Sequence, residues 1–243
     1  DIFASLETNW FYLDQYFLNN SYNTNTIANQ WSAFFNIEKE LILKTIKLSN
    51  SSEEVLDCLM KIIIKKNNHK DWCEKSPPNI SYGERIFNYW PNSKLIHIIR
   101  DPFDIFYSLK EAKKWDSPKE FTDRWISIFK HKKHLEKNSR YKEFRYEEII
   151  KNTKKTLKNI FEFSELSWLD EYANHDNSDR EYNLVSSITG KQSTTLKRLS
   201  KPITAARIGI SKDKLSSEEK YKIKKLVDEK GLLDQFNSCI WKD

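Results

Sequence analysis

The segment LIHIIRDPFDIFYS, residues 95–108, constrains the fold more than any other part of the chain. Its first five residues are mostly apolar and β-branched, and so short a run is typical of a strand buried on both faces of a parallel sheet. Asp101-Pro102 indicates a helix start, because proline suits the first helical turn and aspartate can cap it, with Asp104 placed as in a capping box. The segment therefore predicts a strand, a tight turn and a helix.

Two polar residues lie at informative places in this pattern. Arg100 ends the predicted strand, and Ser108 lies on the helix that follows. Open α/β sheets bind ligands at the carboxyl ends of their strands, and a guanidinium beside a helix start suits a phosphate. In a purely structural alternative, Arg100 pairs with Asp101 or Asp104, and Ser108 is an ordinary helical residue.

The motif RDPFDIFYS resembles the 3′-phosphate-binding motif of sulfotransferases that use 3′-phosphoadenosine 5′-phosphosulfate (PAPS). In that family an arginine ends the strand and a serine eight residues later shares the phosphate, so the resemblance implies that Arg100 and Ser108 bind the 3′-phosphate. The segment RYEEI, residues 145–149, is similar to a second family segment. That likeness implies that Tyr146 contacts the nucleotide; otherwise it is a common strand-end aromatic.

Two further segments carry candidate catalytic residues by resemblance. DIFASLET, residues 1–8, looks like the family segment whose glutamate is the proposed base, which implies that role for Glu7. EKSP, residues 74–77, resembles the segment whose lysine reaches the transferring sulfonate, which implies that role for Lys75. The alternatives are a glutamate favoured by a helix dipole and one solvated lysine among many.

A weaker likeness occurs late in the chain, in residues 201–216. There Arg207 and Lys212 are candidate phosphate-facing groups, although Ser211 stands where the family usually has tryptophan. The alternative is that both are solvated cations.

The resemblance implies an α/β fold, a three-layer sandwich whose central parallel sheet is flanked by helices, similar to P-loop nucleotide kinases. We expect a single domain over residues 1–243 that lacks its N-terminal phosphosulfate-binding loop, because none of the four glycines lies in a Gly-Ser-Thr phosphate loop. We therefore expect the chain to begin after that loop and to be inactive alone. The implied function is sulfonate transfer from PAPS to a hydroxyl or amine acceptor, without a metal.

Composition agrees with an anionic partner, since the formal net charge is +6. The lysines are spread evenly, so we expect a nucleotide and an unknown acceptor rather than nucleic acid. No apolar run approaches the length of a membrane span, and three widely spaced cysteines suit a reducing compartment, so we expect a cytoplasmic protein. The alternatives are a P-loop-related kinase or NTPase and a basic module that binds nucleic acid or another polyanion.

Overall fold

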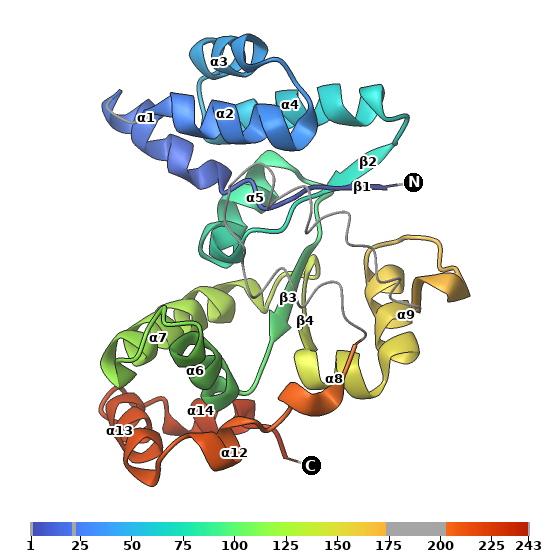
Figure 1. Cartoon of the computed structure of the whole chain (residues 1–243). Helices are drawn as coiled ribbons and strands as arrows, with labels where there is room; N and C mark the ends of the chain where they lie inside the picture. The colour runs from blue at the N-terminus through green and yellow to red at the C-terminus, as the bar shows by residue number, and fades with distance from the viewer. Residues whose placement is uncertain (1, 21–22, 174–202, 243) are drawn as a thin grey trace. The chain divides into compact units, whose positions relative to one another are not determined.

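The computed structural model describes residues 2–20, 23–173 and 203–242 (Figure 1). In these ranges the protein is mixed α/β, mostly helical, with short parallel strand pairs. It divides into two compact units, of which the first contains residues 2–91 and the second contains the described residues from 92 onward. A single domain over residues 1–243 stays a prediction. In the described ranges, no helix combines the length and the apolar character needed to cross a bilayer.

The first unit holds one parallel strand pair and five α-helices in its described part. Strand β1 (Ile2–Ala4) pairs with β2 (Asp71–Cys73), with Ile2 opposite Asp71 and Ala4 opposite Cys73. The helices are α1 (Asp14–Asn19), α2 (Thr24–Phe35), α3 (Lys39–Leu48), α4 (Ser52–Lys66) and α5 (Gly83–Tyr89), and the 3₁₀ helices are η1 (Trp10–Leu13) and η2 (Pro77–Tyr82).

Local sequence explains the helix ends of this unit. The Ser51 hydroxyl accepts a hydrogen bond from the backbone N–H of Glu54 and caps α4, as the Ser-Ser-Glu-Glu run predicts. Helices α1 and α2 end at Asn20 and Asn36, whose φ angles are 50° and 51°. Asparagine tolerates this left-handed conformation better than most residues do, so it takes the place that glycine often occupies at helix ends.

An arginine ties three elements of the first unit together. The Arg85 guanidinium, on α5, donates hydrogen bonds to Asp14 at 2.7 and 3.1 Å and to Glu53 at 2.7 Å. Burial by itself would raise the pKa of Asp14, but hydrogen bonds from Arg85 and Ser52 outweigh burial and lower it. This network joins α1, α4 and α5 beside a core that includes Trp10, Trp31, Ile42, Leu56, Leu59, Met60 and Ile63.

The second unit surrounds another parallel strand pair. Strand β3 (Leu95–Ile99) pairs with β4 (Tyr141–Arg145), with Leu95 opposite Tyr141 and Ile99 opposite Arg145. Its helices are α6 (Pro102–Glu111), α7 (Pro118–Leu135), α8 (Tyr146–Lys151), α9 (Thr153–Phe163), α12 (Ser211–Lys214), α13 (Ser217–Asp228) and α14 (Leu233–Cys239), and its 3₁₀ turns are η3 (Asp170–Ala173) and η4 (Ala205–Arg207). Figure 1 shows α6 and α7 on one side of the pair and α9 on the other.

A cluster of buried aromatic and aliphatic side chains holds α6 in place. Phe103 and Phe106 of α6 pack with residues of α7, α13 and α14: Phe121, Ile223, Val227 and Phe236. Helix α13 is fixed at its start by a complete capping box between Ser216 and Glu219, as its sequence predicts. The helix that follows Arg100 is therefore anchored by the core of the unit.

The sheet differs from the sequence-based expectation in two ways. Strand β2 pairs with β1 and β3 pairs with β4, so in the described residues the strands form two short sheets instead of one continuous sheet. Moreover, Ile96 and Ile98 are 38% and 46% exposed, so β3 is not buried on both faces. Strand pairing depends on residues far apart in the sequence, and a short apolar run does not determine it.

Candidate functional site

The turn after β3 is built around Asp101. Its Oδ1 accepts hydrogen bonds from the backbone N–H groups of Phe103 (2.8 Å) and Asp104 (3.1 Å), which confirms the predicted helix cap. Its Oδ2 accepts from the Trp241 N–H at 2.9 Å, and its own N–H donates to Glu147 Oε1 at 2.7 Å. Burial raises the pKa of the Asp101 carboxyl, since these hydrogen bonds only partly offset the loss of water.

Asp104 does not complete the expected capping box, because Glu147 occupies the Asp101 N–H. Instead the Asp104 carboxylate, which is fully buried, accepts from the backbone N–H groups of Gly209 at 2.7 Å and Ser211 at 2.9 Å. Gly209 has a φ of +70°, a conformation that favours glycine. Asp104 therefore fastens the start of α6 to the segment around Gly209.

Arg100 lies at the centre of this arrangement. Its guanidinium carbon lies 4.6 Å from the centre of the Tyr146 ring, and its Nη2 donates to the Arg207 carbonyl oxygen at 2.5 Å. The same Nη2 is 3.7 Å from Asp104 Oδ2. The Arg100 Nε is buried and has no hydrogen-bond partner within the described ranges. A buried donor without a partner is costly, so this N–H fits an anionic ligand that accepts from it.

The other three residues predicted to bind nucleotide lie in the same unit. Ser108 is half-buried on α6, eight residues after Arg100. The Arg207 guanidinium donates to both carboxylate oxygens of Glu111, at 3.2 and 2.8 Å, so its charge is paired there. Lys212 is exposed on α12. The second unit thus brings together Arg100, Tyr146 and the Arg207 backbone, while the phosphate-facing roles of Arg207 and Lys212 stay predictions.

The predicted catalytic pair lies in the first unit. Glu7 comes soon after β1 and Lys75 soon after β2, and parallel pairing puts both at the carboxyl edge of that sheet. The Lys75 Nζ donates to Glu7 Oε1. The Lys75 side chain is 72% exposed and the Glu7 side chain is 43% exposed, so both charged groups reach solvent. An accessible carboxylate can accept a proton, and an ammonium group beside it can stabilise negative charge at the same place.

Glu74 fixes the two loops that carry this pair. Its Oε1 accepts from the Thr8 N–H at 3.1 Å, from the Thr8 hydroxyl at 2.9 Å and from the Ser76 hydroxyl, and its Oε2 accepts from Asn79 Nδ2 at 2.7 Å. The Ser76 hydroxyl in turn accepts from the Asn9 N–H at 3.0 Å. Glu74 directly precedes Lys75, and its carboxylate binds Thr8, which directly follows Glu7. The two loops are therefore held together next to the predicted catalytic pair.

Sequence reasoning missed three residues that order these sites: Glu74, Glu147 and Trp241. Glu74 and Glu147 lie inside EKSP and RYEEI, where a carboxylate next to a strand end was an available signal. Trp241 carried no such signal, because it donates to a residue 140 positions earlier.

No group of three or more His, Cys, Asp or Glu side chains in the described ranges is arranged to hold a metal ion. The metal-free reaction stays a prediction.

Comparison with known protein families identifies the family of this chain. No match to the chain was found among curated proteins. The family model described as "Sulfotransferase family" matches residues 7–170, about two thirds of the chain, and this range contains Glu7, Lys75, Arg100, Ser108 and Tyr146. The chain therefore belongs to the sulfotransferase family.

Proposed function

We propose that this sulfotransferase takes its sulfonate group from PAPS and transfers it to a hydroxyl or amine acceptor. The observation that carries the proposal is the buried Arg100 Nε at the end of β3, beside the Tyr146 ring. It has no hydrogen-bond partner in the part of the chain that the structure describes. A phosphate dianion supplies the acceptor oxygens that such a guanidinium needs. We also propose a three-layer sandwich with a central parallel sheet, similar to P-loop kinases.

The nucleotide roles fall on the second unit. Arg100 and the Ser108 hydroxyl bind the 3′-phosphate, and Tyr146 contacts the nucleotide while its ring supports the Arg100 guanidinium. Asp104 and Asp101 position these groups without touching the nucleotide, because each is buried and fully engaged with backbone N–H groups. Arg207 and Lys212 add positive charge near the phosphate.

The chemical roles fall on the first unit. The acceptor O–H or N–H gives its proton to Glu7, its heavy atom forms a new bond to sulfur, and the bond from sulfur to the 5′-phosphate oxygen breaks. Adenosine 3′,5′-bisphosphate leaves with the electron pair of that bond. Lys75 stabilises the negative charge that spreads over the sulfonate and leaving oxygens, as cations do in phosphoryl transfer. The contact between Glu7 and Lys75 supports these two roles, because it places the base and the cation close enough together to act on the same group.

Nucleotide binding provides the first test. We expect the full-length protein to bind adenosine 3′,5′-bisphosphate more tightly than adenosine 5′-phosphate, because only the former carries the 3′-phosphate. Arg100→Ala should weaken bisphosphate binding by about 2 kcal/mol, or roughly 30-fold, by isothermal titration calorimetry. Arg124→Ala is the matched control, since Arg124 is an exposed arginine on α7. Equal affinity for the two nucleotides would refute the assignment.

Turnover provides the second test. In the full-length protein, Glu7→Gln and Lys75→Ala should lower kcat by about 100- to 10,000-fold while bisphosphate affinity stays unchanged, because both residues act on the reacting group. Glu40→Gln and Lys44→Ala alter exposed residues of α3 and serve as controls. If the Glu7 and Lys75 variants turn over as fast as these controls, neither residue takes part in the reaction.

A further inference from the structure

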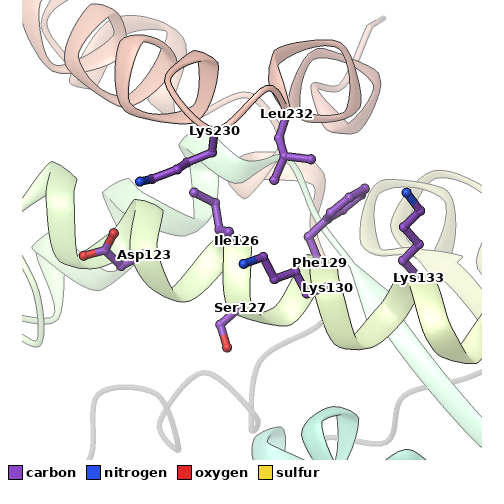
Figure 2. Close-up of a pocket in the computed structure, with 8 residues that line it drawn as sticks. All are labelled: Asp123, Ile126, Ser127, Phe129, Lys130, Lys133, Lys230 and Leu232. Atoms are coloured by element: carbon purple, nitrogen blue, oxygen red, sulfur yellow. The ribbon is translucent and has the colours of Figure 1, made fainter.

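A groove lies on the second unit between α7 and the turn that joins α13 to α14. Its volume is about 590 Å³, and its lining residues are Asp123, Ile126, Ser127, Phe129, Lys130, Lys133, Lys230 and Leu232 (Figure 2). Residues 230–232 lie outside the region that matches the family, whereas α7 lies inside it. One wall of the groove, α7, therefore lies in the region that matches the family, and the other wall, residues 230–232, lies outside that region.

The wall is determined by a glycine turn. Gly231 has a φ of +67°, its N–H donates to the Asp228 carbonyl at 2.8 Å, and the Leu232 N–H donates to the Val227 carbonyl at 3.3 Å. These two bonds close the end of α13 in a way that favours glycine at this position. As a result Lys230 and Leu232 both lie over α7, as Figure 2 shows.

The interior of the groove is apolar and well supported. Ile126, Phe129 and Leu232 contribute aliphatic and aromatic surface to it. Phe129 stacks on Trp125 with ring centres 5.3 Å apart, and Trp125 in turn lies 5.0 Å from the buried ring of Phe236. The aromatic wall is thus continuous with the core of the unit, which gives it a fixed shape.

The rim carries an excess of positive charge. Lys130, Lys133 and Lys230 are exposed, and no ion pair joins any of them to another residue in the part of the chain that the structure describes. The single carboxylate of the lining, Asp123, is neutralised by Lys119 at 2.7 Å. Three unpaired ammonium groups around an apolar interior complement a molecule that is both apolar and anionic.

We infer that this groove binds a small amphiphilic anion: a compact apolar body, such as a fused aromatic ring pair, that bears one carboxylate or sulfonate. The volume lies within the range of ordinary small-molecule sites, and a mostly apolar lining with a few placed charges is typical of them. The apolar body fills the space between Phe129 and Leu232, and the anionic group meets Lys130 and Lys230. None of the residues that line the groove is among the nucleotide and catalytic residues proposed above.

The probe that tests the inference is 1-naphthoate, with uncharged 1-naphthalenemethanol as its matched control. Both are titrated into the protein in the presence of excess adenosine 3′,5′-bisphosphate, while the methyl NMR signals of Ile126 and Leu232 are recorded. We expect naphthoate to shift both methyl signals saturably and the alcohol to bind more weakly. The local signals report on the groove whether or not the bisphosphate binds, so a failure of the proposed function cannot be mistaken for a failure here.

Charge variants complete the experiment. Lys130→Gln combined with Lys230→Gln should weaken naphthoate binding by about 2- to 30-fold, because each of the two exposed ion pairs contributes roughly 0.2–1 kcal/mol. Lys214→Gln combined with Lys225→Gln removes the same charge from exposed positions outside the lining and should leave binding unchanged. The inference is overturned if the alcohol binds as tightly as naphthoate, if both lysine pairs have the same effect, or if the Ile126 and Leu232 signals do not respond at millimolar naphthoate.

Discussion

Replacing Asp104 with asparagine should detach the segment around Gly209 from the start of α6. The carboxylate is fully buried and holds one backbone N–H on each oxygen, those of Gly209 and Ser211. An asparagine has the same shape but only one acceptor oxygen. Its amide nitrogen is a donor, so in either orientation it faces one of the two N–H groups, and donor then meets donor.

The magnitude follows from these contacts. A hydrogen bond to a charged acceptor contributes about 1.5–3 kcal/mol, and the bond that asparagine retains is weaker because its acceptor is neutral. We therefore expect Asp104→Asn to lower the free energy of unfolding by about 2–4 kcal/mol. That is a large fraction of the roughly 5–15 kcal/mol by which domains are usually stable. Asp213→Asn, at an exposed position of α12, should change it by less than about 0.5 kcal/mol.

Two measurements check this reasoning. Urea denaturation gives the change in stability, and amide hydrogen exchange reports on Gly209 and Ser211 directly. We expect both amides to exchange faster in Asp104→Asn than in Asp213→Asn. If the two variants are equally stable and both amides keep their protection, then the Asp104 carboxylate does not hold this segment.

Three further changes test other parts of the molecule. Glu74→Ala should lower stability by about 2–4 kcal/mol in urea denaturation, because it leaves the buried Thr8 N–H and hydroxyl without an acceptor; unchanged stability would contradict the role given to Glu74. Burial by itself would raise the pKa of Glu143, but hydrogen bonds with His97, Lys132 and Tyr141 lower it to about 2, below the ordinary 4.5. The Glu143 carboxylate therefore stabilises the fold above about pH 4.5, and this contribution is lost as the pH falls towards 2. Glu143→Gln should accordingly flatten the dependence of stability on pH over that window, and identical curves would exclude this role. Trp241→Pro removes the backbone N–H that donates a hydrogen bond to Asp101, and it should weaken bisphosphate binding. Trp241→Ala keeps that N–H, so this variant should bind the bisphosphate more tightly than the proline variant. Equal binding by the two variants would show that the N–H is unimportant.

The sequence predicted the elements whose signals are local. Residues 95–111 form the expected strand, cap and helix. The signals for them are the apolar run, the Asp-Pro pair and the helical spacing, and all three lie within a few residues of one another. Helices α4 and α13 begin at the serine caps that their Ser-Ser-Glu-Glu runs predict, for the same reason. Membership of the sulfotransferase family, which four short motifs predicted, is confirmed by the match of the family model to residues 7–170.

What the sequence could not predict depends on distant partners. Asp104 has the spacing of a capping residue, yet its partners lie 105 and 107 residues away, and Glu147 takes the cap position. The apolar run at residues 95–99 predicted a fully buried strand, but burial depends on which elements cover the sheet. The roles of Glu7, Lys75, Arg100, Ser108, Tyr146, Arg207 and Lys212 remain predictions, because a role in catalysis or binding is a property of the complex with substrate.

The hydrogen bond from Trp241 to Asp101 has a consequence for biosynthesis. The two residues are 140 positions apart, and a ribosome that adds about 5–20 residues per second needs about 7 to 30 s to make the chain between them. For most of that interval β3 and α6 have already been synthesised, but the Oδ2 of Asp101 lacks the donor it has in the folded protein. The turn beside Arg100 therefore reaches its final form only after almost the whole of this sequence has been translated, and a chain stalled earlier exposes an incomplete turn to chaperones and proteases.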